Sequence, residues 1–269
     1  MVKFRTVSLS ALGVSTHDRL SDFYTSSWQR GESALPLLLV RLLLTSSALA
    51  ILTWSLVEGA SPYWLIYLTN WGLLLVSATM ISGLALSFAF RFKKQIETTN
   101  LPWFVKSYWI FFNVTAAISI MITALYWILL YDPAAQEKLG LRALWLDIST
   151  HGLASCIIVV ELFSSRTPIR LAHIYQPLFL GIWYAAFSGI YYAAGGTDRN
   201  GNVFIYAVLN WQEPRSTAIV VAGSVVAVVV LYVILWGFAV FRDKLSLTYV
   251  RTHNLPITPP DAKADRQMV

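Results

Sequence analysis

Residues 64–90 read WLIYLTNWGLLLVSATMISGLALSFAF, a run that contains no Asp, Glu, Lys or Arg. A helix needs about 20 apolar residues to cross about 30 Å of hydrocarbon, so this run is long enough to span a membrane. It also lacks the alternating apolar and polar residues of an outer-membrane strand, and a helix satisfies its own backbone hydrogen bonds. The stretch therefore predicts a transmembrane helix.

Five further apolar segments predict the same structure. Of the 269 residues, 57% are hydrophobic and 13% are charged, a composition far from that of a soluble domain. The six expected helices cover residues 35–57, 64–90, 108–131, 143–163, 174–194 and 217–241. We therefore expect an all-α bundle of six transmembrane helices within residues 35–241. Residues 1–34 would form a cytoplasmic N-terminal arm without a secretory signal, and residues 242–269 a disordered cytoplasmic tail.

Basic residues predict the orientation of this bundle. Fifteen Lys and Arg lie in the arm, in the tail and in the links after the second and fourth helices, against four in the other three links. The positive-inside rule then places both termini in the cytoplasm, for a plasma membrane and an endoplasmic reticulum protein alike. Because topology accounts for the net charge of +6, a nucleic-acid-binding function loses its main support.

Few polar residues lie inside the expected helices, and an ionisable one costs about 2.5–3.5 kcal/mol there, so each needs a partner or a cavity. Arg41 near the start of the first helix and Glu161 near the end of the fourth lie at matching depths. We expect them to form a structural ion pair that fixes the helix register. The other candidates are Thr69, Asn70, Asn113, Asp147 and His151.

Helical spacing suggests a second pairing. Asp147 and His151 are four residues apart on the helical face that also carries Glu161, and Thr69 begins a stripe of small residues on the second helix. At 1.5 Å per residue, Thr69 and His151 lie about 7 and 12 Å below the outer ends of their helices, so they can meet. A histidine base would activate the threonine hydroxyl as a nucleophile, with Asp147 orienting the imidazole. The same spacing also fits a purely structural hydrogen bond between helices.

The sequence holds no pattern for other chemistry. Cys156 is the only cysteine, and His17, His173 and His253 lie in the tails or at the cytoplasmic lip, so no metal centre is expected. There is no P-loop, dinucleotide fingerprint or nucleophile elbow, and no cofactor is expected.

One link on the outer side is unusually long. Residues 195–216, GGTDRNGNVFIYAVLNWQEPRS, combine a glycine-rich turn with an apolar stretch that is too short to span the membrane. The link would be either a structured cap over the mouth of the bundle or an interfacial segment, and we favour the interfacial segment. It is also a candidate surface for a protein partner.

Two of these stretches resemble a known family. YLTNWG at residues 67–72 and GGTDRNGNVFIYAVLNW at 195–211 closely resemble the rolling stone family of multi-pass membrane proteins, and the resemblance covers most of residues 21–241. That family is associated with myoblast fusion in insects. The resemblance therefore implies a non-enzymatic membrane protein of cell adhesion or fusion as one function.

A more distant resemblance points to chemistry. The sequence is similar to the androgen-induced membrane hydrolases, which cleave fatty acid esters of hydroxy fatty acids with a membrane-embedded Thr and His. Thr69 matches their aromatic-Leu-Thr context, and His151, ten residues before Glu161, matches their histidine. Those hydrolases carry a second histidine where this chain has Ile148.

Together these observations favour a membrane hydrolase of lipid esters that needs no cofactor. Thr69 would attack the acyl carbonyl and His151 would act as base and then as acid, while the amide of Asn70 would help to stabilise the oxyanion. A non-enzymatic protein of adhesion or fusion is the alternative. A transporter that moves protons past Asp147, His151, Glu161 and Arg41 is a third, less favoured because no inverted repeat is visible.

Overall fold

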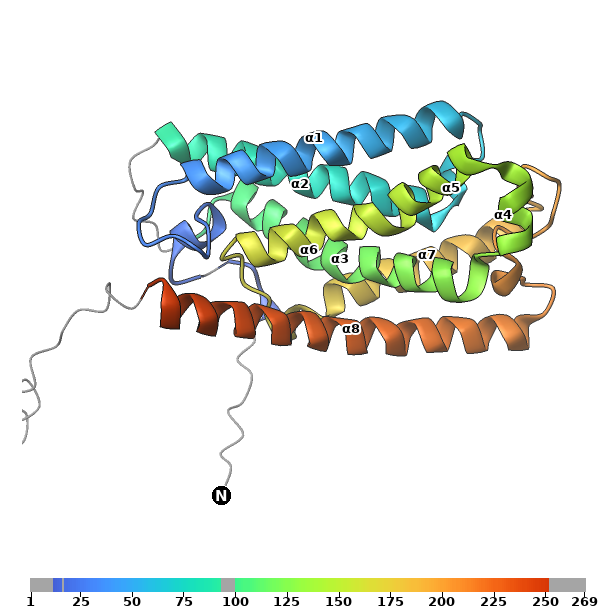
Figure 1. Ribbon diagram of the computed structural model, residues 1–269. Helices are drawn as coiled ribbons and strands as arrows, with labels where there is room; N and C mark the ends of the chain where they lie inside the picture. Colours follow the sequence, from blue (N-terminus) through green and yellow to red (C-terminus); the bar gives the residue numbers. More distant parts are fainter. Residues whose placement is uncertain (1–11, 16, 93–99, 252–269) are drawn as a thin grey trace, which may run out of the picture.

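The protein is a bundle of long helices that lie side by side (Figure 1). The computed structural model describes residues 12–15, 17–92 and 100–251. The helices are α1 (Leu35–Glu58), α2 (Leu68–Phe92), α3 (Trp103–Leu125), α4 (Pro133–Leu139), α5 (Leu141–Ile148), α6 (Ala154–Ser164), α7 (Tyr175–Ala193) and α8 (Pro214–Tyr249). Two π-helical segments extend this set: η4 (Tyr126–Leu130) continues α3, and η5 (Ser149–Leu153) joins α5 to α6. The structure confirms the predicted all-α membrane bundle.

Five of these helical segments are long and apolar enough to cross a membrane: residues 35–58, 68–92, 103–130, 141–164 and 214–249. The sixth expected span is the 19-residue α7, which packs against α3 and α8 but does not reach the hydropathy of a membrane span. Its four tyrosines, with Gln176 and Pro177, lower its mean hydropathy. The number of membrane spans and the cytoplasmic location of both termini therefore stay predictions. Residues 12–34 and the end of α8 do lie at the same end of the bundle (Figure 1).

The small residues of α2 allow close packing with its neighbours. A Cβ atom on Gly72 would lie 2.5 Å from Ile122 Cδ1 of α3, and one on Gly83 would lie 2.9 Å from Tyr108 Cε2. Since both distances are shorter than a normal contact, a side chain at either position would displace its neighbour on α3, and the glycines favour close packing of the two helices. This packing fixes the outer half of α3, and hence η4, beside the first turn of α2.

The N-terminal arm is folded where the structure describes it. Phe23 is fully buried, and Ser27 donates from its backbone N to Ser164 O at 2.9 Å and from its hydroxyl to Ser165 O at 2.6 Å. Thr25 is buried as well, with its hydroxyl bonded to Ser21 O at 2.7 Å. The arm therefore closes the predicted cytoplasmic end of the bundle.

The last helix is longer than the sequence predicted. We expected the tail to begin at residue 242, but α8 continues to Tyr249, and residues 252–269 lie outside the described part of the chain. Arg242 is buried and donates to Leu162 O at 2.7 Å, and the hydroxyl of Ser246 donates to Ser27 O. Arg242 and Ser246 thus bond to the protein instead of to water, although a hydropathy pattern assigns such polar residues to a tail. A helix of 36 residues is about 54 Å long, so α8 extends well beyond the hydrocarbon layer.

Candidate active site

Thr69 and His151 meet at the predicted outer end of the bundle. Thr69 is in the first turn of α2 and His151 is the middle residue of η5, and Thr69 Oγ1 lies 3.1 Å from His151 Nε2. The histidine side chain is only 11% exposed. The distance is within the range of a nucleophile and its general base.

Both π-helical segments contribute to this site. His151 in η5 stacks on Tyr126 in η4, with ring centroids 3.5 Å apart and the ring planes 5° from parallel. A π-helical turn inserts one residue into a helix, which rotates the residues that follow and often marks a functional site. Here the two insertions place an imidazole and a phenol face to face, so the histidine ring cannot rotate freely.

The surroundings of His151 determine which ring nitrogen carries the proton. Nδ1 lies 3.1 Å from the backbone oxygen of Asp147 and 3.0 Å from Thr150 Oγ1. The Asp147 oxygen can only accept, and the Thr150 hydroxyl already donates to Leu146 O at 2.9 Å. Nδ1 is therefore the donor, and in the neutral ring Nε2 is left with a lone pair that faces Thr69.

Asp147 acts differently from the sequence prediction. Its carboxylate Oδ1 is 3.8 Å from His151 Nδ1, too far for a hydrogen bond, and its backbone oxygen orients the ring instead. The carboxylate faces the hydroxyl of Tyr126. When the amide of Gln136 is oriented so that both of its ends are satisfied, it donates to Asp147 Oδ2 at 2.8 Å. The carboxylate is thus positioned to stabilise an imidazolium through space.

Asn70 does not point at the Thr69 hydroxyl. Its amide nitrogen donates to Trp64 O at 2.6 Å, and its Oδ1 accepts from Ser55 Oγ at 3.4 Å. These bonds hold the short 3₁₀ turn η3 (Trp64–Ile66) against α1 and α2. The predicted oxyanion contact is therefore wrong for this arrangement: Asn70 is a structural residue, since successive residues of a helix face different directions.

Arg41 and Glu161 lie together near the opposite end of the bundle, as their depths predicted. Arg41 Nη2 is 2.7 Å from Glu161 Oε1, and both side chains are fully buried. The hydroxyl of Tyr108 accepts from Arg41 at 2.6 Å and donates to Glu161 at 2.7 Å. Arg41 Nη1 also donates to Phe23 O and to Gly83 O, each at 2.9 Å. The pair and its hydrogen-bond partners join five parts of the chain and are remote from His151.

Asn113 belongs to a further buried polar group, where its amide nitrogen lies 3.1 Å from His173 Nδ1 and 3.1 Å from Gln176 Oε1. This group joins α3 to the start of α7. Within the described residues, no three His, Cys, Asp or Glu side chains are grouped as ligands for a metal ion.

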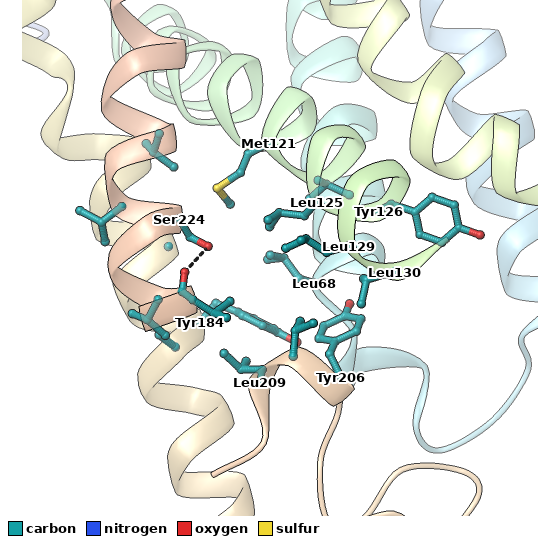
Figure 2. Close-up of a pocket in the computed structure, with 18 of the residues that line it drawn as sticks. Leu68, Met121, Leu125, Tyr126, Leu129, Leu130, Tyr184, Tyr206, Leu209 and Ser224 are labelled. Carbon is teal, nitrogen blue, oxygen red and sulfur yellow. Dashed lines mark hydrogen bonds between the residues drawn. The ribbon is translucent and has the colours of Figure 1, made fainter. Parts of the chain in front are cut away.

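Two cavities meet at Thr69. One is almost entirely apolar and lies between α3, α7 and α8, with an empty volume of about 860 Å³ that includes its opening. Figure 2 shows Met121, Leu125 and Leu129 on one side of it and Tyr184, Leu209 and Tyr206 on the other. The lining of the second, here called the polar cavity, includes four ionisable residues, Glu58, Asp147, His151 and Arg199. The lining of both includes Thr69, Tyr126, Leu130 and Tyr206.

The long outer link is a structured cap rather than the interfacial segment that we favoured. The Asp198 carboxylate accepts from the backbone N of Asn200 and of Asn202, each at 2.8 Å, which closes a tight turn at Gly201. Trp211 at the other end donates to Ser188 of α7 at 3.1 Å. Between these two anchors, Ile205 and Leu209 are buried, whereas Val203 is exposed.

Three residues of the site were missed by the sequence analysis: Tyr126, Thr150 and Tyr206. The π-helical turn η4 places Tyr126 in the site, and the spacing of an ideal helix does not predict such a turn. Thr150 gives no signal in the sequence, because many helix threonines bond to their own backbone as it does. Tyr206 lies in the VFIYAVLNW stretch, whose place over the bundle no local pattern specifies. Only the length and composition of that link could have drawn attention to it.

The apolar bundle, with buried polar groups joined between helices, defines an integral multi-pass membrane protein. The chain belongs to the rolling stone family, since the family model described as "Protein rolling stone" matches residues 5–255. It is 26% identical over 234 residues to Protein rolling stone of Drosophila melanogaster, a match that covers 82% of this chain and 83% of that protein. No solved structure matches the chain. The similarity to the androgen-induced hydrolases stays a prediction.

Proposed function

We propose that the protein is a membrane hydrolase of lipid esters in which Thr69 is the nucleophile and His151 the general base. The observation that carries the proposal is the 3.1 Å contact between Thr69 Oγ1 and His151 Nε2 at the junction of an apolar and a polar cavity. An ester needs such a junction, because its acyl chain is apolar and its reacting carbonyl must meet polar groups and water.

In the first half of the reaction, Thr69 Oγ1 bonds to the carbonyl carbon while its proton passes to His151 Nε2. The electron pair of the C=O bond moves to the carbonyl oxygen and then returns, which breaks the bond to the alcohol. The departing alcohol takes the proton from Nε2 and leaves an acyl group on Thr69. The Asp147 carboxylate, 3.8 Å from Nδ1, stabilises the transient imidazolium.

In the second half, a water molecule from the polar cavity gives a proton to His151 Nε2 and attacks the acyl carbon. Collapse of this intermediate breaks the bond to Thr69 Oγ1, which recovers its proton from the imidazolium. The fatty acid is released and the site returns to its starting state. The stacked Tyr126 ring keeps Nε2 directed at Thr69 throughout both halves.

A fluorophosphonate probe tests the nucleophile directly. Purified protein in lipid nanodiscs should be labelled at Thr69, as seen by peptide mass spectrometry, and Thr69→Ala should not be labelled. Thr79→Ala is the matched control, because Thr79 is on the same helix but bonds to Thr115 at 2.8 Å and lines neither cavity. Absence of labelling in folded wild-type protein would favour the non-enzymatic adhesion or fusion protein instead.

The apolar cavity predicts how acyl chain length affects the rate. A Cβ atom on Gly181, which lines this cavity, would meet nothing within 4 Å, so Gly181→Leu should fill part of the cavity without straining α7. Excluding two or three methylene groups of a long chain costs about 2 kcal/mol, or about 30-fold in kcat/KM. We expect this loss for palmitoyl esters and little change for butyryl esters. Gly237→Leu on α8, also into open space but away from the cavity, should change neither.

A further inference from the structure

Tyr206 of the cap reaches the candidate nucleophile from outside the helices that carry it. Its side chain lines both cavities together with Thr69, and its hydroxyl interacts with the side chains of Thr69 and Tyr184 and with the backbone of Leu68 and Thr69. Of the two tyrosines that line both cavities, Tyr126 turns its hydroxyl to Asp147, and Tyr206 turns its hydroxyl to Thr69. Tyr206 has no role in the proton transfers described above.

The surroundings of Tyr206 hold its ring in place. The ring meets Tyr67 edge to face, with centroids 5.7 Å apart, and the cap residues Ile205 and Leu209 on either side of it are buried. The hydroxyl of Tyr184 donates its single proton to Ile66 O at 2.7 Å, so Tyr184 can only accept from Tyr206 and cannot donate to a substrate. Tyr206 is therefore the hydrogen-bond donor of the two phenols.

The hydroxyl proton of Tyr206 is retained at neutral pH. Burial raises the pKa of Tyr206 above its ordinary value, because a phenolate would lose its hydration inside the cap. A neutral phenol is a hydrogen-bond donor, whereas a phenolate is not. The group beside Thr69 is thus a preorganised donor.

We propose that Tyr206 donates its phenolic O–H to the carbonyl oxygen of the ester as negative charge develops there. The inference rests on the proposed Thr69 and His151 mechanism. When Thr69 Oγ1 bonds to the carbonyl carbon, the oxyanion is two bonds away from Oγ1, within reach of a donor already directed at that atom. The proton stays on Tyr206 throughout, and when the electron pair returns to re-form the C=O bond the hydrogen bond weakens again. The donor that Asn70 does not supply comes from the cap.

This assignment gives the cap a part in the chemistry. The nucleophile and the base are on α2 and η5, whereas the donor is on the 195–216 link, which is anchored by the Asp198 turn and by Trp211. The nucleophile, the base and the donor are therefore together only when the cap packs on the bundle.

The test is Tyr206→Phe, which keeps the ring and its contact with Tyr67 and removes only the hydroxyl. Loss of one oxyanion donor should lower kcat by about 10²–10³-fold, with KM changed by less than about threefold. The rate of fluorophosphonate labelling of Thr69 should fall as well, since the reagent develops charge on a similar oxygen. Tyr175→Phe, which removes an exposed phenol that lines neither cavity, should keep kcat.

A second variant separates donation from packing. A difluorotyrosine at position 206 has a more acidic hydroxyl, so its activity should be lost as pH rises through the lowered pKa, because the phenolate cannot donate. Wild-type protein should show no loss in that pH range. If wild-type protein is active and labelled while Tyr206→Phe keeps its kcat, only the role of Tyr206 is refuted. If folded wild-type protein shows neither turnover nor labelling, the hydrolase and the role of Tyr206 fail together.

Discussion

Ester turnover is expected to fall by at least about 10³-fold in Thr69→Ala and by a similar factor in His151→Ala, because each change removes one partner of the nucleophile and base pair. The two residues act as a unit, so the double variant should be no slower than the slower single variant. The measurement is kcat/KM for a long-chain fatty acid ester in nanodiscs, with folding checked by the thermal unfolding midpoint.

Two outcomes would contradict this mechanism. One is a double variant whose loss is the product of the single losses, which would mean that Thr69 and His151 act independently. The other is a single variant that keeps more than about a tenth of the wild-type rate, since loss of a catalytic nucleophile lowers the rate by far more than tenfold.

Thr150→Val tests the orientation of the His151 ring. The change removes one acceptor of the Nδ1 proton and leaves the Asp147 oxygen, so a smaller loss of kcat/KM is expected.

The largest effect on stability is expected from the buried ion pair. Glu161→Ala leaves the Arg41 guanidinium without its carboxylate in a site that is fully buried, and loss of one partner from such a pair costs about 3–5 kcal/mol. Unfolding of the purified protein in a graded series of denaturing detergent, followed by circular dichroism, measures the loss.

Arg142→Ala is the matched control for this experiment, because Arg142 pairs with Glu58 at an exposed position, with 77% of the arginine side chain accessible. An exposed pair is worth about 0–1 kcal/mol. Glu161→Ala and Arg142→Ala with equal effects would show that the buried pair is not a major source of stability. Since Glu161 is far from His151, the remaining folded Glu161→Ala protein should still be labelled at Thr69.

The sequence predicted the parts of this protein that depend on regular periodicity. Apolar runs located the long helices, and spacing along an ideal helix brought Thr69 towards His151 and Arg41 towards Glu161. These predictions use only the rise and the turn of a helix and the cost of an unpaired charge in the membrane. They hold because a spanning helix has few alternative ways to satisfy its polar groups.

The details around His151 could not be predicted in the same way. The π-helical turns of η4 and η5 depart from the ideal period by one residue, and the stacking of Tyr126 on His151 depends on both departures. The role of Asp147 changed for a related reason: spacing shows that two residues share a face but does not show whether the carboxylate or the backbone oxygen is nearer to the ring. The cap depends on contacts between residues far apart in the chain.

The ion pair between α1 and α6 also imposes an order on how the protein is made. Glu161 follows Arg41 by 120 residues, so the ribosome delivers the charged first helix long before the carboxylate that neutralises it. A lone charge inside a membrane helix costs about 2.5–3.5 kcal/mol. Gly83 and Tyr108, which precede α6 in the chain, offer Arg41 hydrogen-bond acceptors but no negative charge. The charge of Arg41 is therefore neutralised only after α6 has entered the bilayer. The bundle closes late in synthesis, when its first and fourth predicted spans find each other.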